Sequence, residues 1–256
     1  MKERTDSTKD PWLFASDFDN TLFFHDGSGF HEQDIRMIRA WQKAGNLFGI
    51  CSGRSLHHLI HEFQPLFSAA GLTPDFFICT SGAILADGEG RVLAEHPLDR
   101  AVVQEAAHRC LDAVMVHNSE ELFCLNRQWE TFQPVSRIPE DRTFYGLSTW
   151  AEDSRRINVA GLPLEAYVNT VTVDYVPAGV SKGTGILELC RILGLDPKKT
   201  AGMGDSWNDL PMIDTVSYGF TFPDGPNIVK KASAYEVDSI AAALEKVSEI
   251  RHLQKL

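Results

Sequence analysis

The sequence contains no long hydrophobic run and no excess of basic residues. No stretch approaches the roughly 20 apolar residues that are needed to span a bilayer. Residues 1–11 are polar and charged, without the apolar run of a secretory signal, so we expect a cytoplasmic protein. The 24 basic and 35 acidic residues give a formal net charge of −11. Because nucleic acids and anionic membranes are bound through excess Lys and Arg, we expect neither as a partner.

Cysteine is also scarce. The five cysteines are scattered along the chain and form no Cys-x-x-Cys pair. Since a disulfide framework or a zinc site usually shows a regular cysteine spacing, we expect buried, reduced thiols instead.

Apolar residues, in contrast, are abundant enough for a sizeable core. They make up 43% of the 256 residues, which suffices for one ordinary domain and a smaller second one. In the first and last parts of the chain, short apolar runs typical of buried strands alternate with segments of helical spacing. We predict strands at residues 12–16, 47–51, 75–80 and 200–204, and helices at 32–43, 55–67, 182–193, 210–214 and 239–250. This alternation predicts an α/β fold with a doubly wound, Rossmann-like parallel sheet.

The middle of the chain has a different pattern. Turn-forming residues at 87–90, between two apolar segments, predict a hairpin over 83–95. A helix near 102–113 and strand-like segments at 114–116, 122–125 and 156–160 follow. Hairpins mixed with helices favour an α+β unit with an antiparallel sheet. We therefore predict a discontinuous core domain, residues 1–82 and 176–256, around an inserted α+β cap domain of residues 83–175.

Four aspartates follow two of the predicted core strands. Asp17 and Asp19 come after the first strand, and Asp205 and Asp209 come after the strand at 200–204. Asp is also common in turns and helix caps, so either pair alone could be purely structural. Ligands bind at the carboxyl ends of parallel strands, and we expect all four carboxylates at that edge of the sheet. Such a cluster requires a hard cation, and oxygen ligands indicate Mg²⁺.

Ser52, Gly53 and Lys182 offer groups that can bind an anion. Ser52 and Gly53 follow the strand at 47–51, where a hydroxyl and accessible backbone N–H groups suit a phosphate. A small-residue turn into the next helix would explain the same two residues. Lys182 begins a predicted helix, where the helix dipole disfavours a cation. A nearby buried anion therefore explains this lysine better than solvation does.

Taken together and in this order, these elements resemble the motifs of the haloacid dehalogenase superfamily. They are Asp17-Phe18-Asp19-Asn20-Thr21, Ser52-Gly53-Arg54, Lys182 and Gly204-Asp205-Ser206-Trp207-Asn208-Asp209. An insert between Ser52 and Lys182 is similar to that of the Cof-type subclass, subclass IIB. Its members carry an α/β cap and mostly hydrolyse sugar phosphates and similar metabolites. The resemblance covers nearly the whole chain and implies a phosphoric monoester hydrolase that acts on a small phosphorylated metabolite.

The resemblance also implies how the acidic residues act. Asp17 is the expected nucleophile, and Asp19 is the expected general acid and then base. Mg²⁺ is expected on the carboxylates of Asp17 and Asp205 and on the backbone carbonyl of Asp19. Asp209 is expected as a further ligand, or as the group that orients the metal's waters. A carboxylate nucleophile is ionised at pH 7 and needs no base, so the reaction would pass through a phosphorylated aspartate.

The resemblance further implies which residues bind the phosphoryl group. Ser52, Gly53 and Lys182 are expected to hold its oxygens, and Asn208 is expected to position Lys182 or the phosphate. Ser81 stands where the family often has Asn. Asp224 likewise replaces a frequent Asn, near the expected active-site edge, so substrate preference stays open.

Two other functions use similar residues. A phosphomutase of the same superfamily would share Asp17 and Asp19 but return the phosphoryl group to its substrate. A non-enzymatic phospho-accepting signalling protein also has an acidic Mg²⁺ pocket and a lysine. Such a protein needs neither an acid at Asp19 nor an insert as long as residues 83–175, which argues against it. The physiological substrate and the oligomeric state do not follow from the sequence.

Overall fold

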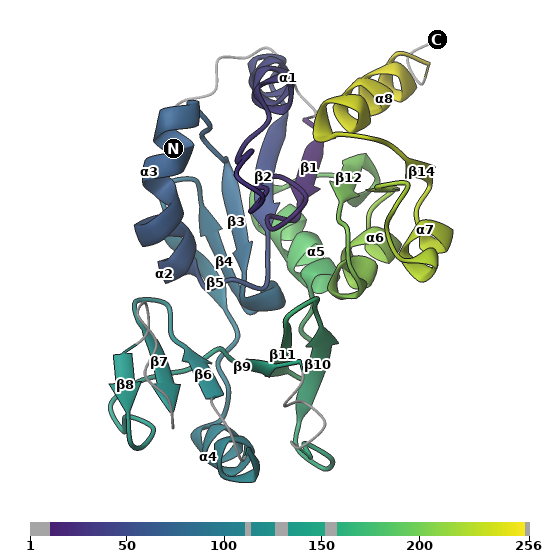
Figure 1. The fold of residues 1–256 in the computed structure, drawn as a ribbon. Helices are drawn as coiled ribbons and strands as arrows, with labels where there is room; N and C mark the ends of the chain where they lie inside the picture. The colour runs from purple at the N-terminus through teal and green to yellow at the C-terminus, as the bar shows by residue number, and fades with distance from the viewer. Residues whose placement is uncertain (1–10, 111–113, 126–132, 152–157, 254–256) are drawn as a thin grey trace.

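The computed structural model describes residues 11–110, 114–125, 133–151 and 158–253. Its strands form two sheets, one below the other in Figure 1. The strands of the smaller sheet lie, in chain order, between strands of the larger one, so the smaller sheet is an insertion. The predicted fold class, an α/β core with an inserted α+β unit, is confirmed.

The larger sheet forms the core domain and is mostly parallel. In sheet order, its described strands are β14 (Tyr235–Glu236), β13 (Tyr218–Thr221), β12 (Thr200–Met203), β1 (Leu13–Ser16), β2 (Leu47–Cys51), β3 (Phe76–Cys79), β4 (Ile84–Asp87) and β5 (Val92–Glu95). Pairing is parallel from β14 to β3 and antiparallel from β3 to β5. The loops that follow β12, β1 and β2 therefore leave the same edge of the sheet from neighbouring strands.

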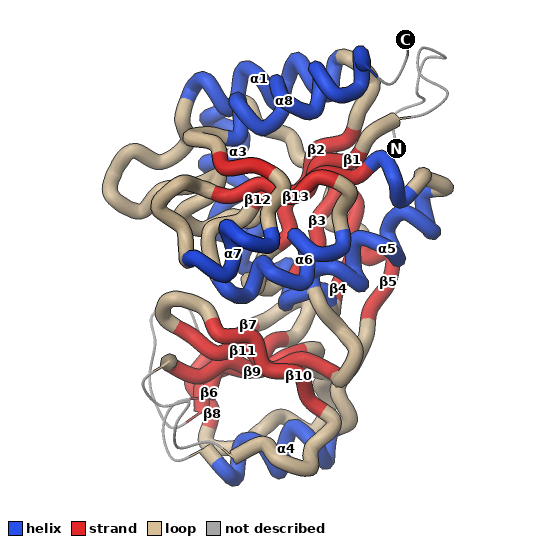
Figure 2. The backbone as a smooth tube through the Cα atoms, turned by 90° about the vertical axis from the view of Figure 1, so that its right-hand side faces the viewer, coloured by secondary structure: helices blue, strands red, loops and turns tan. Residues whose placement is uncertain are grey.

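Side chains alternate along these strands and divide the core into two layers. In β1, Phe14 points into one layer and Leu13 into the other. The helices on the Phe14 side are α1 (Glu32–Lys43), the continuous run of α2 (Leu56–His58), η1 (Leu59–Phe63) and α3 (Gln64–Ala70), and α8 (Ile240–Leu253). The helices on the Leu13 side are α5 (Lys182–Leu193) and α6 (Leu210–Thr215). Helices thus cover both faces of the sheet, as the doubly wound prediction requires (Figure 2).

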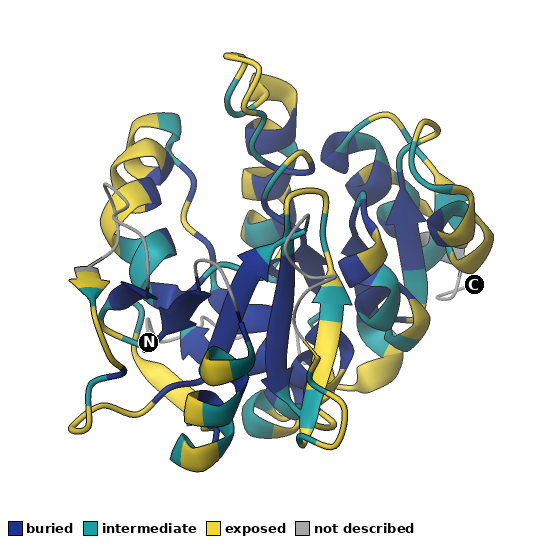
Figure 3. Ribbon diagram, turned by 60° about the horizontal axis from the view of Figure 1, so that its bottom comes forward, coloured by how far each residue is buried: buried dark blue, intermediate teal, exposed yellow. Residues whose placement is uncertain are grey.

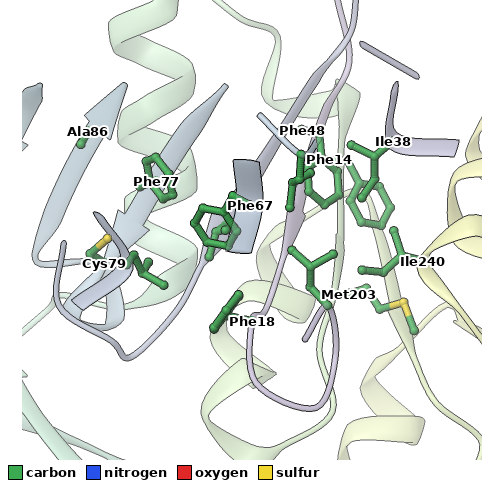
Figure 4. Close-up of a cluster of buried hydrophobic side chains, with 14 of the residues drawn as sticks. Phe14, Phe18, Ile38, Phe48, Phe67, Phe77, Cys79, Ala86, Met203 and Ile240 are labelled. Carbon is green, nitrogen blue, oxygen red and sulfur yellow. The ribbon is translucent and has the colours of Figure 1, made fainter. Parts of the chain in front are cut away.

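Aromatic rings fill much of the Phe14 layer and anchor the loop after β1 (Figure 4). Phe14 stacks on Phe48 of β2, with ring centroids 5.8 Å apart. Phe18, in the loop itself, is fully buried and meets the ring of Phe67 edge-on at 5.8 Å. Edge-on aromatic pairs add stability beyond their buried area. The backbone on either side of Phe18 is therefore fixed by the core.

The smaller sheet is largely antiparallel. In sheet order, its described strands are β10 (Leu164–Val168), β11 (Thr172–Pro177), β9 (Gly146–Trp150), β6 (Val114–His117), β7 (Leu122–Leu125) and β8 (Gln133–Val135). Among these strands, only β7 and β8 pair in parallel. Helix α4 (Arg100–Arg109) packs on the face that points away from the core domain, through residues such as Val103 (Figure 2). The opposite face points toward the core.

Parts of the sequence prediction differ from the structure. Residues 83–95 were expected in the insert, but β4 and β5 extend the core sheet because β4 pairs with β3. The strand expected at 156–160 lies partly outside the described residues, and the described part, 158–160, forms no strand. The helix expected at 102–113 ends at Arg109, and residues 111–113 lie outside the described part. Strand β10 was not predicted, because its side chains are exposed or half-buried and form no apolar run.

Most strands are buried, and the outer faces of the helices around them are exposed (Figure 3). The exceptions include β5 and β10, each at the edge of its sheet, whose residues are exposed or half-buried. All five cysteines are buried, as expected. Within the described part of the chain, no helix is both long and apolar enough to cross a membrane. Buried polar and charged side chains gather where the core strands end, among them Asp17, Ser52, Lys182 and Asp209.

Candidate active site

Asp17 begins the loop after β1 and is held at a fixed place. Its backbone N–H donates a 2.8 Å hydrogen bond to the carbonyl of Met203, the last residue of β12. The next residue, Phe18, is anchored in the core. Asp17 is 6% exposed, and its Oδ1 accepts a 2.6 Å hydrogen bond from Lys182 Nζ. The carboxylate is therefore oriented by an element from the other end of the chain.

Lys182 is a buried cation that joins two strand-end loops. It is the first residue of α5, and Ser181 caps this helix by accepting a 3.0 Å hydrogen bond from the N–H of Thr184. Lys182 Nζ donates to Asp17 Oδ1 and to Asp209 Oδ1, both at 2.6 Å. A charge with 1% exposure must be paired, because burying it alone is very unfavourable. The buried anions expected near Lys182 are these two carboxylates.

The loop after β12 brings Asp205 and Asp209 to the same place. Asp209 Oδ2 accepts 3.0 Å hydrogen bonds from the backbone N–H groups of Asp205 and Ser206. Gly204 allows this close approach, because a Cβ at this position would lie 2.3 Å from Asp209 Cγ. Asp205 Oδ1 accepts a 3.0 Å hydrogen bond from the hydroxyl of Thr21. The loop is thus folded around the carboxylate of Asp209.

Three carboxylates in this cluster repel one another. One oxygen each of Asp17, Asp205 and Asp209 lie within 4.8 Å of one another. Burial is the largest cause that raises the pKa values of Asp17 and Asp205, and the negative charge of Asp209 is the second. The pKa of Asp17 lies well above its ordinary value, and that of Asp205 is raised to about 6. Burial alone would lower the pKa of Lys182, but the charges of Asp17 and Asp209 raise it well above its ordinary value. Lys182 therefore stays charged, yet one ammonium cannot balance three carboxylates.

The donor set of this cluster fits a hard divalent cation. Asp17 Oδ2 and Asp205 Oδ2 accept no hydrogen bond from the described residues, whereas both oxygens of Asp209 do. Carboxylate oxygens are the ligands that Mg²⁺ prefers, and a cation would offset the repulsion. Asp17 and Asp205 are best placed to hold such an ion. The contacts of Asp209 suit it to orienting Lys182 and the loop.

Ser52 and Gly53 lie in the loop after β2, next to the start of α5. Ser52 is buried, and its Oγ accepts a 3.1 Å hydrogen bond from the N–H of Arg54, which leaves the hydroxyl proton free to donate. The residue before it, Cys51, contacts the backbone carbonyl of Lys182 at 3.9 Å. Asn208 is also buried, and its Oδ1 has no partner among the described residues. Ser52, Gly53 and Asn208 thus follow core strands that end at one edge of the sheet, whereas Lys182 reaches the site from the start of α5.

Asp19 lies outside the three-carboxylate cluster and is bound by two basic side chains. Arg54 donates to both of its oxygens, from Nε and Nη2, each at 2.7 Å. His25 Nε2 lies 2.6 Å from Asp19 Oδ1. Burial would raise the pKa of Asp19, but the hydrogen bonds and charge of Arg54, and then those of His25, outweigh it and lower this pKa. Asp19 is therefore an ionised hydrogen-bond acceptor in this conformation.

The sequence gives no role to these two partners of Asp19. Arg54 stands in the Ser-Gly-Arg motif, but nothing in the sequence connects it to a carboxylate 35 residues away. Its guanidinium also lies over the ring of Phe63, 4.6 Å from the centroid, which holds it against η1. The preference of Arg for bidentate contact with a carboxylate is the signal that could have suggested the pair.

The two positions that depart from the family pattern have different surroundings. Ser81 is buried with a left-handed backbone (φ 51°), and its Oγ has no partner among the described residues. Since Asn adopts this conformation more readily than Ser, the backbone explains why Asn is frequent there. Asp224 is exposed in the loop before α7 (Asn227–Ala232). Of the two, Ser81 is the one placed beside the site.

Known proteins that are similar to this chain include hydrolases and phosphatases. The model of a family described as haloacid dehalogenase-like hydrolases matches residues 14–158 and 167–243. A phosphoglycolate phosphatase from Methanopyrus kandleri is 25% identical over 242 residues, which cover 93% of this chain and 97% of that protein. A 5-amino-6-(5-phospho-D-ribitylamino)uracil phosphatase from Escherichia coli is 18% identical over 249 residues, 89% of this chain and 90% of its own length. The similarity therefore runs through nearly the whole chain.

Solved structures share the fold. A subclass IIB sugar phosphatase has a TM-score of 0.79 at 18% identity, with 96% of this chain and 100% of the other covered. A phosphatase of the haloalkanoate superfamily from Bacteroides thetaiotaomicron has a TM-score of 0.78 at 20% identity, with 96% and 98% covered. A haloacid dehalogenase-like hydrolase from B. subtilis has a TM-score of 0.78 at 16% identity, with 93% and 99% covered. Core and insert are both included in these matches.

Proposed function

The chain belongs to the haloacid dehalogenase-like hydrolases and is a phosphatase, and from this premise we propose that it hydrolyses a small phosphate monoester with the help of Mg²⁺. The proposed substrate is a sugar phosphate or a related metabolite. The proposed intermediate is a phosphorylated Asp17. The observation that carries the proposal is the buried contact of Lys182 with Asp17 and Asp209, beside Asp205. Such a site combines a carboxylate nucleophile with a fixed positive charge for the phosphoryl oxygens.

In the proposed first step, Asp17 Oδ1 attacks the phosphorus and the bond to the substrate's alcohol breaks. Lys182 Nζ already lies 2.6 Å from this oxygen, so it is placed to hold an oxygen of the arriving phosphoryl group. Ser52 and Gly53 would bind the other oxygens, and Asn208 would orient the group. A Mg²⁺ ion on Asp17, Asp205 and the backbone carbonyl of Asp19 would supply positive charge that offsets the phosphoryl oxygens and the carboxylates.

Asp19 is the proposed general acid of the first step and the general base of the second. It gives a proton to the departing alcohol, and it later takes one from the water that cleaves the phosphorylated Asp17. In the conformation described here, both oxygens of Asp19 accept hydrogen bonds from Arg54. Since Asp19 is ionised in this conformation, we place its release from Arg54, and the uptake of a proton from solvent by the freed carboxylate, before the first proton transfer.

The insert is proposed to act as a cap over this site. Its strand β11 leads directly into α5, which begins with Lys182. Its strand β9 lies against the core, because a Cβ on Gly146 would be 2.4 Å from Thr80 Cγ2. The predicted division into a core (1–82 and 176–256) and a cap (83–175) is kept as a proposal, with residues 84–95 moved to the core since β4 and β5 pair there.

The test of the proposed function is release of phosphate from a panel of phosphorylated metabolites and one aryl phosphate, with and without Mg²⁺. Asp17→Asn keeps the shape of the side chain but removes the attacking charge. It should lower kcat/KM by about a thousandfold or more. The matched control is Asp214→Asn, at an exposed position of α6, which should behave as wild type.

Two results would contradict this proposal. Activity of Asp17→Asn within about tenfold of wild type, a difference of only about 1.4 kcal/mol, would remove Asp17 from the role of nucleophile. Formation of an isomeric phosphate ester, with no free phosphate, would instead identify a phosphomutase. Intact mass of the wild type during turnover should show one added phosphoryl group.

A further inference from the structure

A buried polar chain lies on the core-facing side of the smaller sheet. It consists of Asp174 in β11, Ser148 in β9 and His117 in β6, on three adjacent strands. Ser148 Oγ lies 2.6 Å from Asp174 Oδ1 and 2.9 Å from His117 Nε2. The residues next to them along the strands pack with α4 on the other face: Val116, Leu147 and Val173. Alternation along each strand therefore turns the polar chain toward the core.

The hydrogen bonds of this chain have a fixed direction. Ser148 has one hydroxyl proton and donates it to Asp174, so His117 must donate its Nε2 proton to Ser148 Oγ. Burial lowers the pKa of His117 to about 4, so the ring is neutral and its Nδ1 is an acceptor. His117 Nδ1 is buried without a partner among the described residues, and Asp174 Oδ2 accepts no hydrogen bond from them. Both open positions of the chain are thus acceptors.

Asp174 faces the loop that is proposed to bind the phosphoryl group. A Cβ on Gly53 would lie 2.5 Å from Asp174 Oδ2 and 3.5 Å from Ser81 Oγ. Asp174 is 7% exposed, and Ser81 Oγ and Thr80 Oγ1 are buried without partners among the described residues. Because Gly53 has no side chain, Asp174 Oδ2 and Ser81 Oγ lie against its backbone, in the loop that also carries Ser52. The described Lys and Arg side chains form no hydrogen bond or ion pair with Asp174.

We propose that Asp174, held by Ser148 and His117, selects the alcohol part of the substrate by accepting a hydrogen bond from its hydroxyl or amino group. The same carboxylate disfavours an alcohol that carries a carboxylate or a second phosphate, because two negative charges in a buried place repel strongly. The substrate class is therefore a phosphate ester of a neutral or cationic, hydrogen-bond-donating alcohol. This inference rests on the proposed function, since it concerns the group that leaves from the same phosphoryl site.

The experiment compares glycerol 3-phosphate with 2-phosphoglycolate, two small esters of which the second has a carboxylate in place of hydroxyl groups. The wild type should have a kcat/KM at least tenfold higher for glycerol 3-phosphate. Asp174→Asn keeps the shape and one acceptor oxygen but removes the charge, so the ratio of the two kcat/KM values should fall at least tenfold. Much of this fall should come from a lower KM of Asp174→Asn for 2-phosphoglycolate. The control, Asp141→Asn, removes a cap carboxylate whose side chain is 76% exposed and should leave the ratio unchanged.

The wild-type ratio tests the inference without any variant, and a preference for 2-phosphoglycolate would overturn it. A ratio in Asp174→Asn within twofold of the wild-type ratio would overturn it as well. An aryl phosphate, which carries neither a hydroxyl nor a carboxylate, separates this result from the proposed function. If the wild type releases phosphate from the aryl ester while the ratios contradict the inference, only the inference fails. If none of the three esters releases phosphate with Mg²⁺ present, the proposed function fails and the inference with it.

Discussion

Replacement of Lys182 by Met tests what holds the acidic cluster together. The change keeps most of the apolar stem and removes an ammonium that lies 2.6 Å from both Asp17 Oδ1 and Asp209 Oδ1. Removal of one partner from a buried ion pair leaves an uncompensated charge and typically costs about 3–5 kcal/mol. Two carboxylates lose the same partner here, so we expect the free energy of unfolding to fall by an amount near the upper end of that range.

The expected loss can be measured by denaturant unfolding and by thermal melting at pH 7.5. For a chain of this size, about 2–4 °C per kcal/mol converts a loss of about 5 kcal/mol into a Tm decrease of about 10–20 °C. Asp17 already has a raised pKa and can take up a proton once the ammonium is gone. The destabilisation should therefore become smaller as the pH falls toward 5, because a neutral carboxyl needs no cation. Lys198→Met, at an exposed position, is the matched control and should change stability by about 0.5 kcal/mol or less.

Either of two outcomes of the unfolding measurements would refute this reasoning. A loss below about 1 kcal/mol, the range of an exposed ion pair, would mean that Lys182 is solvated and not paired in the core. A loss of the expected size that does not diminish at low pH would show that packing around the lysine stem, and not charge, is what the variant removes.

Three further predictions concern other carboxylates. Asp19→Asn should accumulate a phosphorylated enzyme from an aryl phosphate, seen by intact mass, because a good leaving group needs no acid while the attacking water lacks its base; equal losses in the first step for alkyl and aryl esters would contradict this. Asp205→Asn should melt no lower than wild type without Mg²⁺. Added Mg²⁺, at one hundred times its dissociation constant, should stabilise the wild type by roughly 2.7 kcal/mol and Asp205→Asn by clearly less. Equal stabilisation of the two proteins would exclude Asp205 as a ligand. The pKa of Asp174 is raised to about 6 by burial, so its contribution to stability is complete below its unfolded value of 3.8 and is lost as the pH rises through 6. The stability of wild type relative to Asp174→Asn should thus fall by on the order of 3 kcal/mol between pH 4 and pH 7, and a flat difference would argue against a buried, ionised Asp174.

The meeting of Asp17 and Asp205 was predictable from the sequence, and for Lys182 the sequence predicted a buried anion nearby. Short apolar runs identify β1 and β12 as buried strands, and parallel pairing sends their following loops to one edge. Nothing about distances within the loops was needed for that conclusion. The chemical roles of these residues remain proposals, because proximity alone does not determine which carboxylate attacks and which one holds a metal.

The polar chain of Asp174, Ser148 and His117 could not be predicted in the same way. In β11, polar and apolar residues alternate from Thr172 to Tyr175, a pattern typical of a strand with one face in solvent, and in β6 His117 stands at the end of an apolar run. The sequence does not reveal that another domain covers that face. The hairpin of β4 and β5 was misplaced for a related reason, since a turn predicts that two strands pair but not which sheet they join.

The linker that joins the insert to α5 of the core, residues 178–181, limits how the insert can evolve. Only residues 178–181 separate β11 from Lys182, and the hydroxyl of Tyr167 in β10 donates a 2.7 Å hydrogen bond to the carbonyl of Val180 within this linker. On the core side, a Cβ on Gly82 would lie 2.1 Å from the carbonyl oxygen of Ser181, so the linker has no spare room. Insertions and new side chains at the β10–β11 end would therefore displace Lys182 itself. Diversification of the insert is least constrained at β8, the strand farthest from β11 in the sheet order.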